Sequence, residues 1–212
     1  YSFAKFICDE VNELKNSGKS IKVAFLMRDA YLPSIACKAI NGEEIGERIR
    51  ISRFSAWASS FRNKDDVCRY LLDVVSSNRF SDITEQLLLP KQMASELIES
   101  TKKDKNPTLR FLQLIQRKNV LEVIFKKSLE YHTRLKKYLE NQMGLKRGDT
   151  LVFVDLGYSG TAQKVLEPIF REEFGIEITG RYLISLGVPG WNSSRKGLLD
   201  HSWCDDRTML TF

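Results

Sequence analysis

The residues best suited to chemistry lie between Asp155 and Ala162, directly after the apolar stretch Leu151–Val154. A turn of small and hydroxyl-bearing residues that opens a helix leaves several backbone N–H groups without intrahelical partners, and the helix dipole adds positive potential there. Such a turn suits a phosphate, while Asp155 could accept hydrogen bonds from sugar hydroxyls or hold a magnesium ion. The candidate phosphate- and ribose-binding residues are Asp155, Gly157, Tyr158, Ser159, Gly160, Thr161 and Ala162. The alternative is structural, with Ser159 or Thr161 capping the helix and the glycines allowing a tight turn.

A second candidate segment, Arg28-Asp29-Ala30, follows another apolar run, Ile21–Met27. Arg28 would offer a forked and permanently charged donor to a phosphate or pyrophosphate. The alternative is a surface ion pair between Arg28 and Asp29. Arg53, at the end of the next expected strand, could bring a further cation to the same edge.

The elements that must position these residues follow from the hydrophobic pattern. Both apolar runs are typical of strands buried on both faces of a parallel sheet. Helices are expected at Phe3–Asn16, Leu32–Ile40 and from Thr161 to about Phe174, and further strands at Arg48–Phe54, Ile178–Leu186 and Gly197–Trp203. This order predicts an α/β fold with a mainly parallel, Rossmann-like sheet flanked by helices. Because ligands of such sheets collect at the carboxyl ends of the strands, we expect Arg28, Asp155, Ser159 and Thr161 to meet in one pocket.

The middle of the chain has a different pattern. From Asp65 to Asn141 the apolar residues follow almost only helical spacing, which predicts a large all-helical insertion. We therefore divide the chain into a first part of the α/β core at 1–64, a helical insertion or cap at 65–146, and a second part of the core at 147–212.

Composition excludes several classes of protein. Hydrophobic content of 42% and charged content of 28% are those of a globular domain, and no apolar run approaches the roughly 20 residues that cross a bilayer. The four cysteines are isolated and the two histidines lie far apart, so no structural metal site is expected, and reduced thiols favour a cytoplasmic protein. The net charge of +6 indicates either solvated helix faces or a nucleic-acid surface, because the surplus lies in lysines spread along helices. Since the chain starts at Tyr1 without a methionine, we expect other domains of a longer parent chain.

The order of strand, Arg-small-small turn, Pro-containing helix and later strand–acid–Ser-Gly turn resembles the type I phosphoribosyltransferases. In that family the first loop holds pyrophosphate, which implies that role for Arg28, Asp29 and Ala30. The later motif, two acids followed by a Thr-Gly-x-Thr turn, holds the ribose and 5-phosphate of phosphoribosyl pyrophosphate. The resemblance thus implies a phosphate turn at Ser159–Ala162, Asp155 as the second acid, Asp155 and Arg28 as catalytic residues, and Mg²⁺ as a cofactor. Val154 stands where the family has its first acid.

The strings "FLMRDAYLPSIACKAI", "ISRFSAW" and "VFVDLGYSGTAQKVL" also resemble the region that follows the haloacid-dehalogenase-like domain in bacterial predicted hydrolases of that superfamily. We find no D-x-D-x-T/V motif of the hydrolase itself in the sequence, and Asp155-Leu156-Gly157 has a glycine where that motif needs its second acid. A phosphatase that uses Asp155 as its nucleophile is therefore the least favoured interpretation.

Two functions from different classes remain. The first is a phosphoribosyltransferase-like domain that binds a phosphorylated ribose or nucleotide and transfers or removes a group at the anomeric carbon with magnesium. The second is a non-catalytic module that senses a nucleotide, or docks, beside a hydrolase domain of the parent chain.

Overall fold

The protein contains a five-stranded parallel sheet, seen in a computed structural model that describes residues 1–27, 29–186 and 194–200. The strand order is β2-β1-β3-β4-β5, and every neighbouring pair is parallel. The strands are β1 (Ile21–Leu26), β2 (Glu47–Ile49), β3 (Thr150–Tyr158), β4 (Glu177–Ser185) and β5 (Arg195–Asp200). The predicted class, α/β with a parallel sheet flanked by helices, is confirmed.

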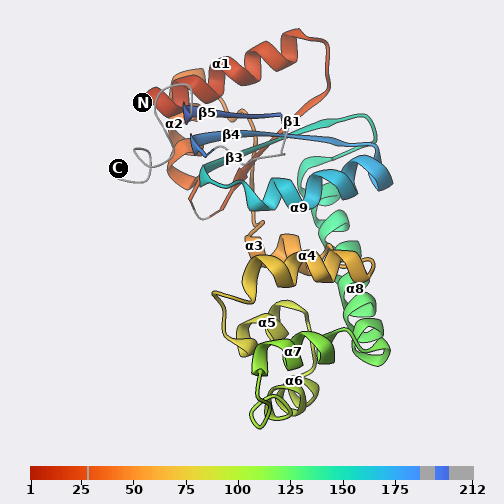
Figure 1. The fold of residues 1–212 in the computed structure, drawn as a ribbon. Helices are drawn as coiled ribbons and strands as arrows, with labels where there is room; N and C mark the ends of the chain where they lie inside the picture. The colour runs from red at the N-terminus through yellow and green to blue at the C-terminus, as the bar shows by residue number, and fades with distance from the viewer. Residues whose placement is uncertain (28, 187–193, 201–212) are drawn as a thin grey trace. The chain divides into compact units, whose positions relative to one another are not determined.

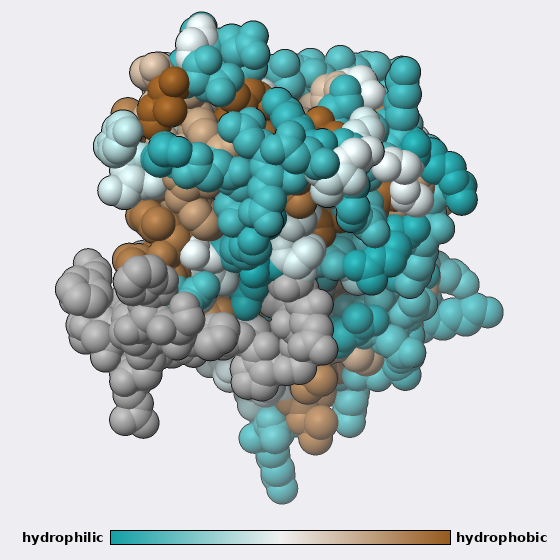
Figure 2. Space-filling model, turned by 90° about the horizontal axis from the view of Figure 1, so that it is seen from above, coloured by the Kyte–Doolittle hydropathy of each residue, from teal (hydrophilic) through white to brown (hydrophobic). Residues whose placement is uncertain are grey.

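Helices cover both faces of this sheet (Figure 1). Helices α1 (Ser2–Asn16) and α2 (Tyr31–Asn41) lie on one face, and α9 (Thr161–Ile169), continued by the π-helix η1 (Phe170–Phe174), lies on the other. Alternate strand residues, among them Phe25, Val152 and Val154, form one buried cluster with α1 and α2. Because successive strand residues point to opposite faces, Asp155 points to the face that α9 covers. The outer surface over α1 and α2 is largely hydrophilic, with hydrophobic side chains gathered toward one end (Figure 2).

The strand order of the sheet reverses at β1. Strand β1 pairs with β2 on one side and with β3 on the other, in the register Ala24↔Phe153 and Phe25↔Val154. In doubly wound sheets of this order the ligand crevice lies between β1 and β3, outside the carboxyl ends of the strands. The turns that follow β1 and β3 therefore leave the same edge of the sheet from neighbouring strands.

The stretch between β2 and β3 forms helices only. They are α3 (Arg53–Ala58), α4 (Lys64–Val74), α5 (Phe80–Gln86), α6 (Lys91–Glu99), α7 (Pro107–Ile115) and α8 (Lys118–Met143). The chain divides into two compact units, 54–137 and the remainder, which is 1–53 with 138–212. The unit 54–137 has a buried core of its own, which includes Phe61, Tyr70, Ile83, Phe111 and Ile124. The sequence-based boundaries at 65 and 146 stay predictions.

The strand expected at Arg48–Phe54 is wrong in its second half. Strand β2 ends at Ile49, where the pairing with β1 also ends at Leu26. The amide of Ile51 then turns back to the carbonyl oxygen of Ile49, and α3 begins at Arg53. Arg53 consequently starts a helix instead of finishing a strand. The alternation of charged and apolar residues in this segment could not show that its pairing with β1 ends at Leu26.

Candidate functional site

The turn between β3 and α9 leads into a helix end that no described side chain caps. The N-cap position is occupied by Gly160, at φ 60°, which has no side chain for this purpose. The hydroxyls of Ser159 and Thr161 instead lie 3.1 Å apart and hydrogen-bond to each other. The structural alternative, in which Ser159 or Thr161 caps the helix, is therefore wrong. The first-turn N–H groups of α9 remain available for an anion at this helix end.

Arg195 fixes this turn from the start of β5. Its Nη1 donates to the carbonyl oxygen of Ser159 at 3.0 Å, and its Nη2 donates to the carbonyl oxygen of Leu186, just beyond β4, at 2.7 Å. The guanidinium thus ties the turn to the carboxyl end of the neighbouring strand. Sequence reasoning missed Arg195, because nothing near it in the sequence shows that its side chain reaches the turn after β3.

Asp155 lies half-buried near the end of β3. Burial is the main reason that its pKa rises to about 6, and the nearby carboxylate of Asp29 raises it further. The hydrogen bond from the amide of Leu156, at 2.8 Å, and the charge of Arg53 both lower the pKa and partly offset the rise. Asp29 and Arg53 are thus each within electrostatic reach of Asp155. The sequence predicts all three residues for the carboxyl edge of the sheet.

Buried polar side chains attach α9 to the sheet beside Asp155. The hydroxyl of Tyr182 donates to Oε1 of Gln163 at 3.1 Å, and Nε2 of Gln163 donates to Glu167 at 3.3 Å. Arg171 completes the chain with a hydrogen bond of 2.6 Å to Glu167. Burial, followed by the charge of Asp155, raises the pKa of Tyr182, so Asp155 lies close to this network. The network was not predicted, because it depends on which strand lies beneath α9.

Other predicted residues have different positions. Gly157, at φ 120°, faces the neighbouring strand so closely that a Cβ there would meet the carbonyl oxygen of Ile184 at 2.2 Å. Ala30 is fully buried, and its amide donates to the carbonyl oxygen of Leu26. Val154, in the place of the family's first acid, is also fully buried. Arg28 lies outside the described residues, as does the side chain of Tyr158.

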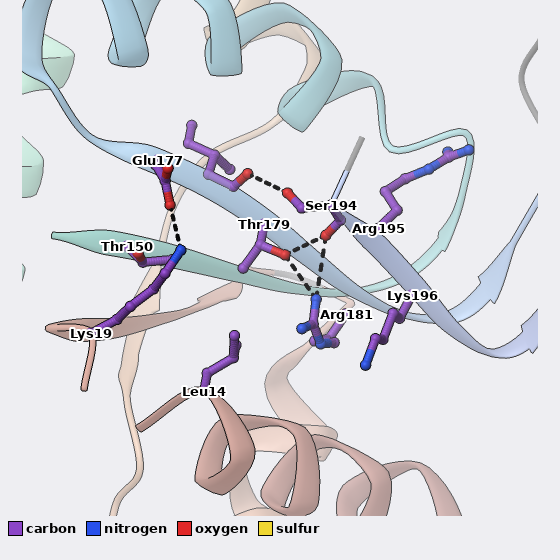
Figure 3. A pocket seen from close by; sticks show the side chains of 10 residues that line it. Leu14, Lys19, Thr150, Glu177, Thr179, Arg181, Ser194, Arg195 and Lys196 are labelled. Carbon is purple, nitrogen blue, oxygen red and sulfur yellow. Dashed lines mark hydrogen bonds and ion pairs between the residues drawn. The ribbon is translucent and has the colours of Figure 1, made fainter. Parts of the chain in front are cut away.

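A pocket of about 440 Å³ opens elsewhere, near the amino ends of β3 and β4 (Figure 3). It is lined by Leu14, Lys19, Thr150, Glu177, Ile178, Thr179, Arg181, Ser194, Arg195 and Lys196. This is not the pocket that the sequence predicts around Asp155, Ser159 and Thr161, because none of these three residues lines it. The side chain of Arg195 points away from Lys19 and Arg181, in keeping with its bonds at the turn after β3.

The charges of this pocket are matched within the protein. Lys19 pairs with Glu177 at 2.8 Å, and Nε of the buried Arg181 lies 2.8 Å from Oε2 of Glu10 in α1. Lys196 adds a second cation to Glu10 at 3.0 Å. Arg181 also donates to Thr179 and to the carbonyl oxygen of Gly180, each at 2.8 Å. An anion here would have to compete with these internal partners.

The described residues contain no helix long and apolar enough to cross a membrane, and no group of three or more metal-binding side chains. No protein-family model matches the chain, and no match was found among curated proteins. The class that the fold defines is thus an α/β domain with a five-stranded parallel sheet, and the function must be argued from its site.

Proposed function

We propose that this chain binds a phosphorylated ribose or nucleotide at the carboxyl edge of its sheet, as a phosphoribosyltransferase-like domain. The observation that carries the proposal is the pairing of β1 with β3 where the strand order reverses. This pairing brings Asp29 and Asp155 to one edge, beside the helix end of α9 that no described side chain caps. Ligands of open α/β sheets bind at such switch points.

Each group has a role in the proposed complex. The first-turn amides of α9 and the hydroxyls of Ser159 and Thr161 hold the sugar phosphate. Asp155 accepts from the ribose hydroxyls. Arg28 binds the pyrophosphate, and Arg53 adds positive charge to the same edge. The helix end and the acid would then bind opposite ends of one phosphorylated sugar.

Two carboxylates at one edge also suit a magnesium ion. Mg²⁺ is usually held by one or two carboxylates together with substrate phosphates and water. Asp155 is the first candidate ligand and Asp29, from the turn after β1, is the second. Asp29 would supply an acid in place of the family's first acid, where this chain has Val154. When bound, the ion would neutralise charge on the departing pyrophosphate.

The proposed reaction is a transfer or hydrolysis at the anomeric carbon. It needs no side-chain nucleophile, because a dissociative transition state is stabilised mainly by positioning and by fixed charges. Hydrogen bonds that hold the turn between β3 and α9 would contribute to this positioning. Arg195 holds the carbonyl oxygen of Ser159, and Tyr182 holds the first turn of α9 through Gln163.

A non-catalytic, nucleotide-sensing module is the second candidate. It is favoured by Val154, which packs in the buried core and leaves Asp155 as the acid of that strand end. Phosphatase chemistry at Asp155 is disfavoured, because position 157 has no room for the second acid of that motif. Turnover of phosphoribosyl pyrophosphate to free pyrophosphate separates the first two candidates, since a sensing module binds the ligand and releases no product.

Calorimetric titration with phosphoribosyl pyrophosphate and Mg²⁺ tests the proposal. Ser159→Ala should weaken binding about 10- to 150-fold, which corresponds to the roughly 1.5–3 kcal/mol of a hydrogen bond to a charged group. Ser95→Ala, on the exposed surface of α6, is the matched control and should bind as the unaltered chain does. Equal affinity of the two variants, or no binding by the unaltered chain, would contradict the proposal.

A further inference from the structure

Positive charge is distributed unevenly between the two compact units. The unit 54–137 contains 16 Lys and Arg against 10 Asp and Glu, whereas the remainder of the chain contains 17 of each. The whole formal net charge of +6 therefore belongs to the helical unit. The unit that carries the proposed sugar-phosphate site has no net charge of its own.

Within the helical unit the surplus is concentrated further. Residues 102–137 carry eleven Lys and Arg against three Asp and Glu, while residues 54–101 carry five against seven. The basic stretch comprises the connection after α6, helix α7 and α8 up to Lys137. Arg110 and Lys136 are half-buried, and the other nine cations are exposed. The charge is thus on the solvent side of this stretch.

The acids of this region are too few to balance it. Lys102 pairs with Glu99, and Lys127 pairs with Glu130 at 3.1 Å. The bond from Lys127 is the main cause of the lowered pKa of Glu130, with smaller contributions from the charges of Lys127, Lys126 and Arg134. One glutamate therefore lies among several cations on the same helix.

The exposed side of α8 forms a row of these cations. Val120, Ile124 and Leu135 are buried on its core side. Lys126, Arg134 and Lys137 lie at helical spacing on the exposed side, with the half-buried Glu130 between the first two. At 1.5 Å per residue, Lys126 and Lys137 are about 16 Å apart along the axis, a length over which one strand of B-form DNA passes about five phosphates. The guanidinium of Arg134 lies 5.2 Å from the ring centre of Tyr131, which places an aromatic ring among the cations.

An anionic membrane surface is the competing partner for such a helix. Membrane-surface helices place a broad apolar face in the lipid. The apolar side of α8 is instead used in the core of the unit, and Leu129 is the one large hydrophobic residue that is clearly exposed on the described helix. The solvent side is therefore cationic without an apolar stripe, which favours a polyanion in water.

We propose that residues 102–137 form a docking surface for the phosphodiester backbone of a nucleic acid, bound without sequence preference. Exposed lysines and arginines that each neutralise a phosphate release counterions, and such binding weakens steeply with salt. This surface lies on the helical unit, so the inference does not rest on the proposed sugar-phosphate site. Single-stranded RNA and duplex DNA share the recognised backbone.

The test measures binding of the full chain to a labelled 20-nucleotide RNA and to a 20-base-pair DNA duplex between 50 and 200 mM salt. Three exposed lysines of α8 are neutralised together in the variant Lys118→Gln, Lys126→Gln, Lys137→Gln. On the RNA, the slope of the logarithm of its binding constant against the logarithm of the salt concentration should become shallower by about 2. Each of the three lost phosphate contacts removes about 0.7 from this slope. The matched control is Lys15→Gln, Lys64→Gln, Lys91→Gln, which removes the same charge from exposed positions on three other helices. The control should keep the slope of the unaltered chain.

Three results would overturn the proposal. The first is no binding of either nucleic acid at 50 mM salt. The second is an equal loss of slope in the control, which would show that net charge alone matters. The third is binding to vesicles that contain 30% phosphatidylserine without binding to nucleic acid, which would make the partner a membrane surface. If the chain binds nucleic acid as proposed, the tighter of the two probes shows whether its phosphodiester partner is RNA or duplex DNA.

Discussion

The two edges of the sheet both carry charged side chains, but they differ in how those charges are matched. At the amino edge, Arg181 and Lys196 share Glu10, and the acid and the buried guanidinium lie 2.8 Å apart. At the carboxyl edge, burial and the neighbouring Asp29 raise the pKa of Asp155, and α9 starts without a side-chain cap. The amino edge pairs its charges within the protein, although burial lowers the pKa of Arg181 and the contact between its Nε and Oε2 of Glu10 is an ion pair without a hydrogen bond. The carboxyl edge retains groups that a ligand could satisfy, which is typical of a functional site.

The largest expected loss of stability comes from breaking the buried ion pair at the amino edge of the sheet. Glu10→Gln removes the carboxylate partner of Arg181, whose exposed fraction is 3%. Removing one partner of a buried ion pair costs about 3–5 kcal/mol, because the other charge is left buried. The free energy of unfolding, from urea denaturation at pH 7, measures this loss.

Glu13→Gln is the control for that variant. Glu13 lies on the same helix, with 74% of its side chain exposed and at 4.0 Å from Lys196. Its loss should cost less than about 1 kcal/mol, as for other exposed pairs. If the two glutamine variants lose the same stability, the amino edge is not held by its buried pair.

A second variant tests the geometry of the carboxyl edge. Gly157→Ala forces a side chain onto a residue at φ 120° whose Cβ would lie 2.2 Å from the carbonyl oxygen of Ile184. We expect a loss of about 3 kcal/mol, from backbone strain together with displacement of β4. Gly18→Ala is the control, because Gly18 has a similar sign of φ, at 79°, and open space around it.

The control should lose only about 1 kcal/mol, the strain of a left-handed residue. Thermal and urea unfolding of both variants measure the difference. An equal loss at the two positions would mean that the β3–β4 contact next to the turn does not constrain position 157.

A third variant tests whether Asp155 is held at the expense of stability. Its pKa in the folded chain is about 6, above the usual value near 4, so the folded state favours the protonated form. The stability that this preference provides is fully present below about pH 4 and is lost as the pH rises through 6. Asp155→Asn should therefore be more stable than the unaltered chain by about 3 kcal/mol at pH 8, and about equally stable at pH 4.

Urea unfolding between pH 4 and pH 8 measures this effect, and Glu43→Gln, at an exposed position after α2, supplies a reference profile parallel to the unaltered chain. The same Asp155→Asn variant should lose magnesium-dependent binding of phosphoribosyl pyrophosphate. A variant that is less stable at pH 8 would show that Asp155 supports the fold and not a ligand.

Much of the fold could be predicted from local pattern. The runs that became β1 and β3 are apolar on both faces, because helices cover both sides of a parallel sheet, and this pattern survives in the sequence. The end of β2 could not be predicted, because β2 ends where its pairing with β1 ends, at Leu26. Arg53 was consequently expected on a strand, although it still comes within electrostatic reach of Asp155.

The sequence predicts only those residues of the candidate site that belong to one continuous segment. Asp155, Ser159 and Thr161 belong to a single strand–turn–helix, and its chemistry can be inferred from the types of its residues. Arg195 and Tyr182 contribute from β5 and β4, and their roles arise only when those strands pair with β3. The buried pair of Arg181 and Glu10 joins distant parts of the chain in the same way, so no local pattern indicates it.

The most direct test of the central claim is to ask which edge of the sheet a phosphorylated sugar binds. Backbone amide signals of the ¹⁵N-labelled chain should be followed while phosphoribosyl pyrophosphate and Mg²⁺ are added. The account predicts that the largest shifts occur at Asp155 and at Ser159 to Gln163, with little change at Thr179, Arg181 and Lys196. Shifts centred on Thr179, Arg181 and Lys196, or no shifts at either edge, would contradict it.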